Sequence, residues 1–205
     1  MSTEPHEPPI INIAGDLVAL GPMRRELVPL YQRWINDFEV TRTLLVAMRP
    51  MTEEAEAIWF QGESTGRDIV TFTAYERSTL RPIGTTTLRT IDHRLRRADF
   101  GILIGEKDCW GKGYGTETTR LLLDYGFTAL GLHNILLTTQ SFNERAIRAY
   151  RRAGFREFGR RREAHWLGGH AYDVVYMDCL ATEFESPVLH RLLPGRASHH
   201  NAGPH

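Results

Sequence analysis

The sequence predicts one mixed α/β (α+β) domain, built on a sheet of six to seven mostly antiparallel strands with about four helices around it. The first observation is the order of the segments: strand-like and helix-like patterns follow one another as β-α-α-β-β-β-α-β-α-β-β. The second is composition. The chain has 205 residues, of which 41% are hydrophobic and 24% charged, as in ordinary globular domains.

The domain is expected to span residues 15–182. Residues 1–14 contain three prolines and are expected to be a loose N-terminal segment. Residues 183–205 are rich in Pro, Gly and His and are expected to be a flexible tail. The pair His199–His200 is better explained by such a tail than by a metal-binding tract.

In the first half of the chain, alternating and β-branched stretches predict strands, and apolar residues at helical spacing predict helices. The expected strands are Leu17–Leu20, Ile69–Tyr75, Ile83–Ile91 and Ala98–Ile104. One helix is expected around residues 27–35, and a second begins after Thr52, which can cap it, with Glu53 and Glu54 in its first turn.

In the second half of the chain, glycines mark the expected ends of two helices. A helix with two apolar sides is expected to end at Gly131, and another runs from its cap Asn143 to Gly154. The expected strands are Ile135–Thr139, Phe155–Trp166 and Ala171–Leu180, the last two joined by a hairpin turn at Gly168–Gly169.

The charge balance argues against a nucleic-acid binder. Acidic and basic residues number 25 each, so the net charge is +0, whereas nucleic-acid affinity depends on neutralising phosphates. Nearly all the positive charge is arginine, since only Lys107 and Lys112 are lysines. No apolar run reaches the roughly 18 residues of a membrane span, and no start resembles a signal peptide. We therefore expect a cytoplasmic protein with no membrane partner.

A glycine-rich segment, Trp110-Gly111-Lys112-Gly113-Tyr114-Gly115-Thr116, lies between an expected strand and an expected helix. Glycine allows close backbone approach, and a helix N-terminus offers free N–H groups, so this arrangement favours phosphate binding. The segment lacks the Lys-Ser/Thr pair of a Walker loop, and Thr118 stands where a dinucleotide motif needs its last glycine.

Downstream, Asn143 precedes a helix, and Ala149-Tyr150 leads to Gly154-Phe155. With the glycine segment, in this order, the sequence resembles the GNAT superfamily of N-acetyltransferases, most closely its Rim-type branch. The resemblance covers about residues 17–180. It departs from the usual loop in one place, where Trp110 stands in a position that often holds Gln or Arg.

The resemblance implies a sheet that splays between the strands at 100–104 and 135–139, with acetyl-CoA as co-substrate in the gap and no metal. The implied cofactor-binding residues are Ile102, Leu103, Ile104, Trp110, Gly111, Lys112, Gly113, Tyr114, Gly115, Thr116, Asn143, Arg145 and Ala146. It also implies transfer of an acetyl group to a primary amine, by direct attack in a ternary complex.

Tyr150 is the implied proton donor to the leaving thiolate, and Asp99 is the preferred candidate for the general base. Glu163, His165 and Asp173 remain alternatives to Asp99. Cys109 is better explained as a buried thiol than as a nucleophile, because no activating base is evident.

The acceptor would be a protein N-terminus, a polyamine, an amino sugar or another small amine. Its expected contacts are Trp34, Asp37, Glu39 and Trp166. Three alternatives stay open: a non-catalytic acyl-CoA-binding module, transfer of another acyl group such as succinyl, and an unrelated nucleotide-binding protein. A monomer or a homodimer is expected.

Overall fold

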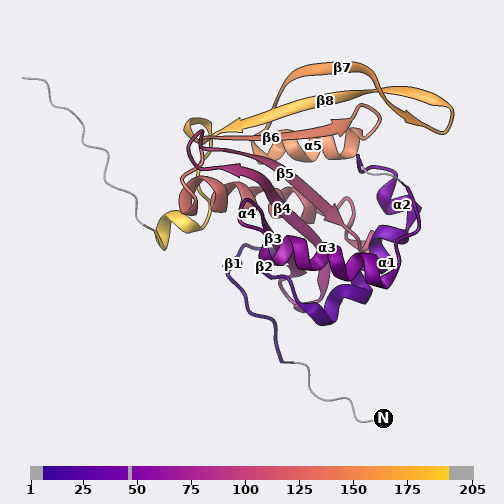
Figure 1. The fold of residues 1–205 in the computed structure, drawn as a ribbon. Helices are drawn as coiled ribbons and strands as arrows, with labels where there is room; N and C mark the ends of the chain where they lie inside the picture. The colour runs from indigo at the N-terminus through magenta and orange to yellow at the C-terminus, as the bar shows by residue number, and fades with distance from the viewer. Residues whose placement is uncertain (1–6, 46–47, 194–205) are drawn as a thin grey trace, which may run out of the picture.

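An eight-stranded sheet is the centre of the computed structural model, which describes residues 7–45 and 48–193 (Figure 1). The strands lie side by side in the order β1-β2-β3-β4-β5-β6-β8-β7. Their bounds are β1 (Ile13–Ala14), β2 (Val18–Pro22), β3 (Val70–Glu76), β4 (Pro82–Asp92), β5 (Arg97–Ile104), β6 (Asn134–Gln140), β7 (Arg156–Leu167) and β8 (His170–Leu180). The expected six to seven strands become eight because β1, with two residues, is too short to carry a pattern.

Five α-helices lie among the described residues: α1 (Val28–Asn36), α2 (Phe38–Thr41), α3 (Glu53–Thr65), α4 (Tyr114–Asp124) and α5 (Glu144–Ala153). The sequence predicted four, and the addition is the single turn α2. Beyond α4 the helix continues as a π-helical segment η3 (Tyr125–Ala129). Short 3-10 turns are η1 (Arg25–Leu27), η2 (Lys107–Cys109), η4 (Ala181–Glu183) and η5 (Leu189–Arg191).

The helices cover both faces of the sheet. Leu103 packs with Trp34 of α1 and Phe60 of α3, whereas Ile102 and Ile104 pack in the larger core with α4 and α5. Because successive strand residues point to opposite faces, α1 and α3 lie on one face and α4 and α5 on the other. None of the helices in the described ranges is long and apolar enough to cross a membrane.

The sheet opens in its middle, as the resemblance implied. β5 and β6 are the parallel pair, and their register ends at Asp99 opposite Leu136. Beyond that point β5 continues to pair with β4 up to Ile104, while β6 continues to pair with β8 up to Gln140. The two halves of the sheet therefore diverge after Asp99, and one edge of β5 is left without a neighbouring strand.

The ends of the described chain extend the domain beyond the expected boundaries. Ile13, from the segment expected to be loose, is 3% exposed and lies in β1. In the segment expected to be a tail, Leu189 is 5% exposed, and the buried carboxylate of Asp124 accepts the backbone N–H of Val188 and of Leu189. These hydrogen bonds to Asp124 hold the residues around Val188 and Leu189 against the core. His199–His200 lies outside the described residues.

Candidate active site

The N-terminus of α4 is an unsatisfied set of backbone donors. Gly113 precedes the helix with φ of 93° and supplies no side-chain cap, whereas Thr52 caps α3 and Asn143 caps α5. A left-handed φ favours glycine, and at Gly111 (φ 75°) a Cβ would meet no atom within 4 Å. Open space above free N–H groups at a helix start is an anion-binding arrangement.

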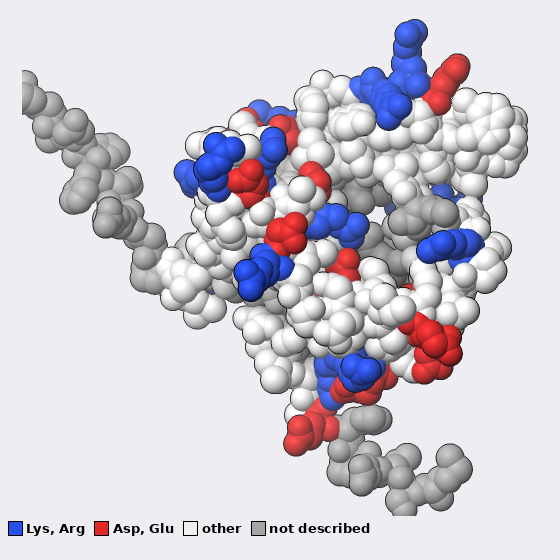
Figure 2. Space-filling model, viewed as in Figure 1, with Lys and Arg blue, Asp and Glu red and all other residues white. Residues whose placement is uncertain are grey.

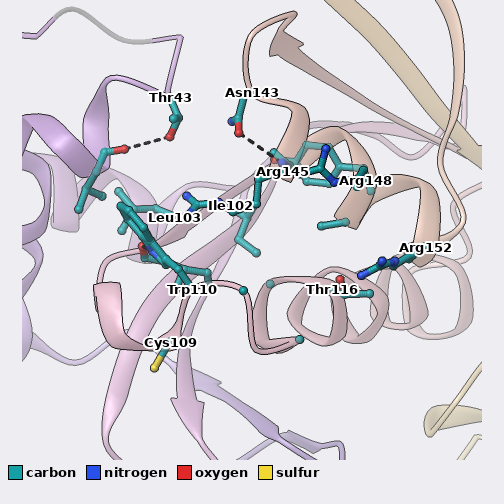
Figure 3. Close-up of a pocket in the computed structure, with 18 of the residues that line it drawn as sticks. Thr43, Ile102, Leu103, Cys109, Trp110, Thr116, Asn143, Arg145, Arg148 and Arg152 are labelled. Carbon is teal, nitrogen blue, oxygen red and sulfur yellow. Dashed lines mark hydrogen bonds between the residues drawn. The ribbon is translucent and has the colours of Figure 1, made fainter.

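A cavity of about 290 Å³ lies over this helix start, between β5 and α5. Gly111, Gly113, Gly115 and Thr116 form one wall. Three arginines of α5, Arg145, Arg148 and Arg152, form another, and Arg152 extends toward Thr116 (Figure 3). Backbone donors and guanidinium groups facing one cavity suit a ligand that carries phosphate groups, as the expected co-substrate does. We call it the cofactor cavity.

Trp110 closes the cofactor cavity toward β5. Its indole Nε1 donates a 2.8 Å hydrogen bond to the carbonyl of Ile104, and the Arg145 guanidinium lies 4.0 Å from the ring centroid (Figure 3). The carbonyl of Gly101 accepts a hydrogen bond from the side-chain hydroxyl of Thr86 on β4. The backbone N–H and C=O groups of odd-numbered β5 residues therefore point toward β4, and those of even-numbered residues point into the gap. The backbone of Ile102 and the N–H of Ile104 thus remain for a ligand, but the Ile104 carbonyl is occupied by Trp110.

Most of the cofactor residues expected from the sequence meet in this cavity. Ile102, Leu103, Ile104, Trp110, Asn143, Arg145 and Ala146 line it together with the glycine wall. Lys112 and Tyr114 do not. Lys112 is exposed, and the Tyr114 hydroxyl donates to Glu76 at 2.7 Å on the side away from the cavity, which raises the pKa of Tyr114 to about 12.

A second cavity, of about 670 Å³, lies on the face that carries α1 and α3. α1, α3 and the strands β3 to β6 contribute its walls, and Figure 2 shows the hollow on this face. We call it the acceptor cavity. Five residues line both cavities: Thr43, Leu44, Ile102, Leu103 and Tyr150. The two cavities therefore meet at the open end of the β5–β6 pair.

Tyr150 lies at this junction. Its ring packs edge-on against Phe100 and Phe155, at centroid distances of 6.0 Å each. Burial raises the pKa of the Tyr150 phenol to about 12, so the hydroxyl is protonated at neutral pH. A protonated hydroxyl on a half-buried residue between two cavities can donate a hydrogen bond to a group that passes between them.

Asp99 lines the acceptor cavity at the last position of β5 that pairs with β6. Arg89 stands opposite it on β4, but among the described residues neither Arg89 nor Arg97 forms an ion pair with it. The alternatives to Asp99 line neither cavity. Glu163 donates its backbone N–H to Asp173 at a bulge of the β7–β8 hairpin, and His165 packs on Phe142.

Of the four acceptor contacts expected from the sequence, three do not line the acceptor cavity. Trp34 does line the acceptor cavity, with its Nε1 donating to Glu106 at 2.8 Å. Asp37 and Glu39 do not line it, because Lys107 pairs with both carboxylates at 2.9 Å. Trp166 is 72% exposed on β7 and lines neither cavity.

Two acids of the acceptor cavity, Glu56 and Glu63, were not anticipated. They lie seven residues apart on α3 with Trp59 between them, so all three share one helix face. Glu63 accepts a hydrogen bond from Thr71, whereas Glu56 is 3% exposed. The spacing Glu56-Trp59-Glu63 was readable in the sequence, but glutamates on a helix are usually solvent-facing.

Cys109 lies below the glycine wall, with its sulfur turned away from the labelled arginines (Figure 3). It is 3% exposed, and burial raises the pKa of its thiol. A thiol with a raised pKa is a poor nucleophile, which agrees with a structural role.

Fold and site together define a class of protein. It is an α+β domain whose sheet opens next to the start of α4, a helix that follows Gly113 and has no side-chain cap. An arginine-lined cavity and a second cavity meet in that opening. Residues 18–156 match the family described as the acetyltransferase (GNAT) domain. The chain therefore belongs to the GNAT acetyltransferase family of enzymes, as the resemblance indicated.

Individual relatives point the same way. The spermidine N(1)-acetyltransferase of Escherichia coli K12 is 36% identical over 94 residues, 46% of this chain and 50% of that protein. The chain thus aligns with only half the length of that relative. The human alpha/beta-tubulin-N-acetyltransferase 9 is 30% identical over 157 residues, 71% of this chain and 75% of that protein.

A solved structure shares the fold. It is a spermidine N-acetyltransferase from Vibrio cholerae in complex with CoA and spermine, with a TM-score of 0.75 and 23% identity. The match covers 82% of this chain and 97% of the other. The two chains therefore share one overall fold.

Proposed function

We propose that the protein transfers an acetyl group from acetyl-CoA to a primary amine by direct attack within a ternary complex. The observation that carries this proposal is the meeting of two cavities at Tyr150, one basic and phosphate-binding in character, the other containing carboxylates. Two bound reactants could meet at this junction without release of an intermediate, and aligning them is itself a large part of catalysis.

The residues of the cofactor cavity would hold the co-substrate. The free N–H groups of Tyr114, Gly115 and Thr116 and the guanidinium groups of α5 would bind its phosphates. The unpaired backbone of Ile102 would bind its amide groups as an added strand would. When bound, acetyl-CoA supplies an acyl carbonyl activated as a thioester.

At the junction, the acceptor nitrogen would form a bond to the acyl carbon as the carbon–sulfur bond breaks. Tyr150 would donate a hydrogen bond to the departing sulfur; its high pKa favours stabilising the thiolate over complete proton transfer. Asp99, which lines the acceptor cavity, would accept the proton that the amine loses, directly or through water. The amine must reach the junction neutral, since a protonated nitrogen has no lone pair.

The acceptor class we favour is a cationic amine of the polyamine type. Two features support it: the carboxylates of the acceptor cavity, Glu56, Glu63 and Asp99, and the spermidine N(1)-acetyltransferases among the relatives. Protein N-termini and amino sugars are the alternatives that the same assay would detect.

The test is thiol release from acetyl-CoA and from succinyl-CoA with a panel of polyamines, N-terminal peptides and aminoglycosides. We expect turnover with acetyl-CoA and at least one amine. Replacing Tyr150 by Phe should lower kcat by about 100-fold while the Kd for acetyl-CoA stays within a few-fold. Tyr176→Phe, on β8 and lining neither cavity, is the control. Acetyl-CoA binding without thiol release for any acceptor would favour a non-catalytic module.

A further inference from the structure

Glu56 is a largely buried residue whose carboxyl group borders the acceptor cavity and forms no hydrogen bond or ion pair in the part of the chain that the structure describes. It is 3% exposed, and burial is the cause of its raised pKa, with no hydrogen bond or ion pair to offset it. It lines the acceptor cavity. Partial desolvation makes the ionised carboxyl unfavourable, and a cationic group bound beside it in the cavity would offset that cost.

The cavity beside Glu56 suits an alkyl chain that carries nitrogen at its ends. Trp59, one helical turn from Glu56, and Tyr31 of α1 line the same cavity, and the two rings lie edge to face with centroids 6.2 Å apart. Methylene groups pack on such rings, and a carboxylate beside them binds an ammonium group. Thus one end of this cavity offers an apolar wall next to an unpaired acid.

Glu56 is separate from the point of transfer. The residues shared by the two cavities are Thr43, Leu44, Ile102, Leu103 and Tyr150, whereas Glu56 lines only the acceptor cavity. The nitrogen that is acetylated must lie at the shared residues, where the acyl group enters. A cation at Glu56 is therefore a different nitrogen of the same acceptor.

We propose that Glu56 is a specificity-determining residue that binds a second, non-reacting ammonium group of the acceptor, so that the enzyme selects amines with two cationic nitrogens. This inference rests on the proposed function, since it concerns the acceptor of that reaction. The carboxyl would be partly protonated at neutral pH when the cavity is empty, and fully ionised when the ammonium group is bound. Acceptor binding would then be weaker below pH 7, where it must displace a proton from Glu56.

Other charged and titratable groups line the same cavity and would also influence the pH dependence of acceptor binding. They are Tyr31 of α1, Arg49, Glu63 of α3, Arg89 of β4, Asp99 of β5 and Tyr150 of α5. The pKa values of Tyr31 and Tyr150 are raised to about 12, so neither phenol titrates between pH 6 and 8. Arginines stay protonated throughout this range. Glu63 already accepts hydrogen bonds from Thr71 and Thr87.

The kinetic test compares 1,5-diaminopentane with 1-aminopentane, which differ only in the second nitrogen. Glu56→Gln should raise KM for the diamine at least tenfold and leave KM for the monoamine and for acetyl-CoA within twofold. Glu56→Asp, which keeps the charge, should recover part of the diamine affinity. The control is Glu53→Gln, an exposed acid in the same helical turn that does not line the cavity. Equal changes with both amines, or none, would overturn the proposal.

A binding measurement separates this inference from the proposed function. With no acetyl-CoA present, the diamine should raise Tm of the wild-type chain more at pH 8 than at pH 6, and should raise Tm of Glu56→Gln less, with no such difference between the two pH values. A shift that depends on Glu56 without any turnover would leave the site standing and remove the acetyltransferase proposal. Turnover of the diamine that is unaffected by Glu56→Gln would do the reverse.

Discussion

Replacing Glu56 by Gln should stabilise the folded protein at neutral and alkaline pH, against the usual expectation for a buried position. The pKa of the Glu56 carboxyl is raised from 4.5 to about 7 by burial. Each tenfold change in a protonation equilibrium is worth about 1.4 kcal/mol, so the ionised carboxyl lowers the free energy of unfolding by about 3 kcal/mol.

The effect depends on pH in a defined direction. Below pH 4.5 the carboxyl is protonated in both the folded and the unfolded chain, and its charge costs nothing. As pH rises from 4.5 to about 7, the unfolded chain releases the proton and the folded chain keeps it, so stability is lost. Above about pH 7 the full cost is present. Glutamine carries no charge at any of these values.

Urea unfolding at pH 5 and pH 8, followed by tryptophan fluorescence, measures this difference. We expect Glu56→Gln to exceed the wild type by about 3 kcal/mol at pH 8, or roughly 6–12 °C in Tm, and by about 1 kcal/mol or less at pH 5. Glu53→Gln, at an exposed position, should differ by less than about 0.5 kcal/mol at both. A difference that is the same at both pH values, or a Glu56→Gln variant less stable at pH 8, would refute the reasoning.

Three further predictions concern the glycine loop, the C-terminal segment and the general base. Gly113→Ala places a side chain on a residue with φ of 93°, so it should lower the free energy of unfolding by about 1–2 kcal/mol and weaken acetyl-CoA binding measured by calorimetry. Its control is Gly62→Ala inside α3, where a Cβ would meet no atom within 4 Å; this variant should raise the free energy of unfolding by up to about 1 kcal/mol. Asp124→Ala leaves the N–H groups of Val188 and Leu189 without an acceptor and should cost about 2–4 kcal/mol in urea unfolding, whereas the exposed Glu185→Ala should cost little. Asp99→Asn should lower kcat most below the pKa of the acceptor amine, and a uniform loss across pH 6–10 would count against its role as base.

The glycine loop and the α5 helix were predictable because their signals are local. The free amides at the start of α4 follow from Gly113 and from a helix that begins without a side-chain cap. The Asn143 cap likewise acts within its own turn, with its side chain accepting from the N–H of Ala146 at 3.3 Å. Such features depend on neighbours three or four residues away, which a sequence displays directly.

Apart from Trp34 and Asp99, most residues that line only the acceptor cavity were not predicted, because their positions depend on residues distant in the chain. Asp37 and Glu39 were expected to face the acceptor, but Lys107, far along the chain, pairs with both. Tyr114 belongs to the glycine motif, yet its hydroxyl is held by Glu76 of β3. Which partner a charged or polar side chain finds is decided by the strands and helices that the fold brings beside it.

By itself, the sequence determined the order of strands and helices, the glycine-rich loop before α4 and the family, because each depends on short-range patterns. Only the tertiary structure decided that Tyr150 joins two cavities, that Lys107 holds Asp37 and Glu39, and that Glu56 is buried rather than solvent-facing. The reason is physical: burial and pairing set the free energy of a charged group, and both are made by residues distant in the chain.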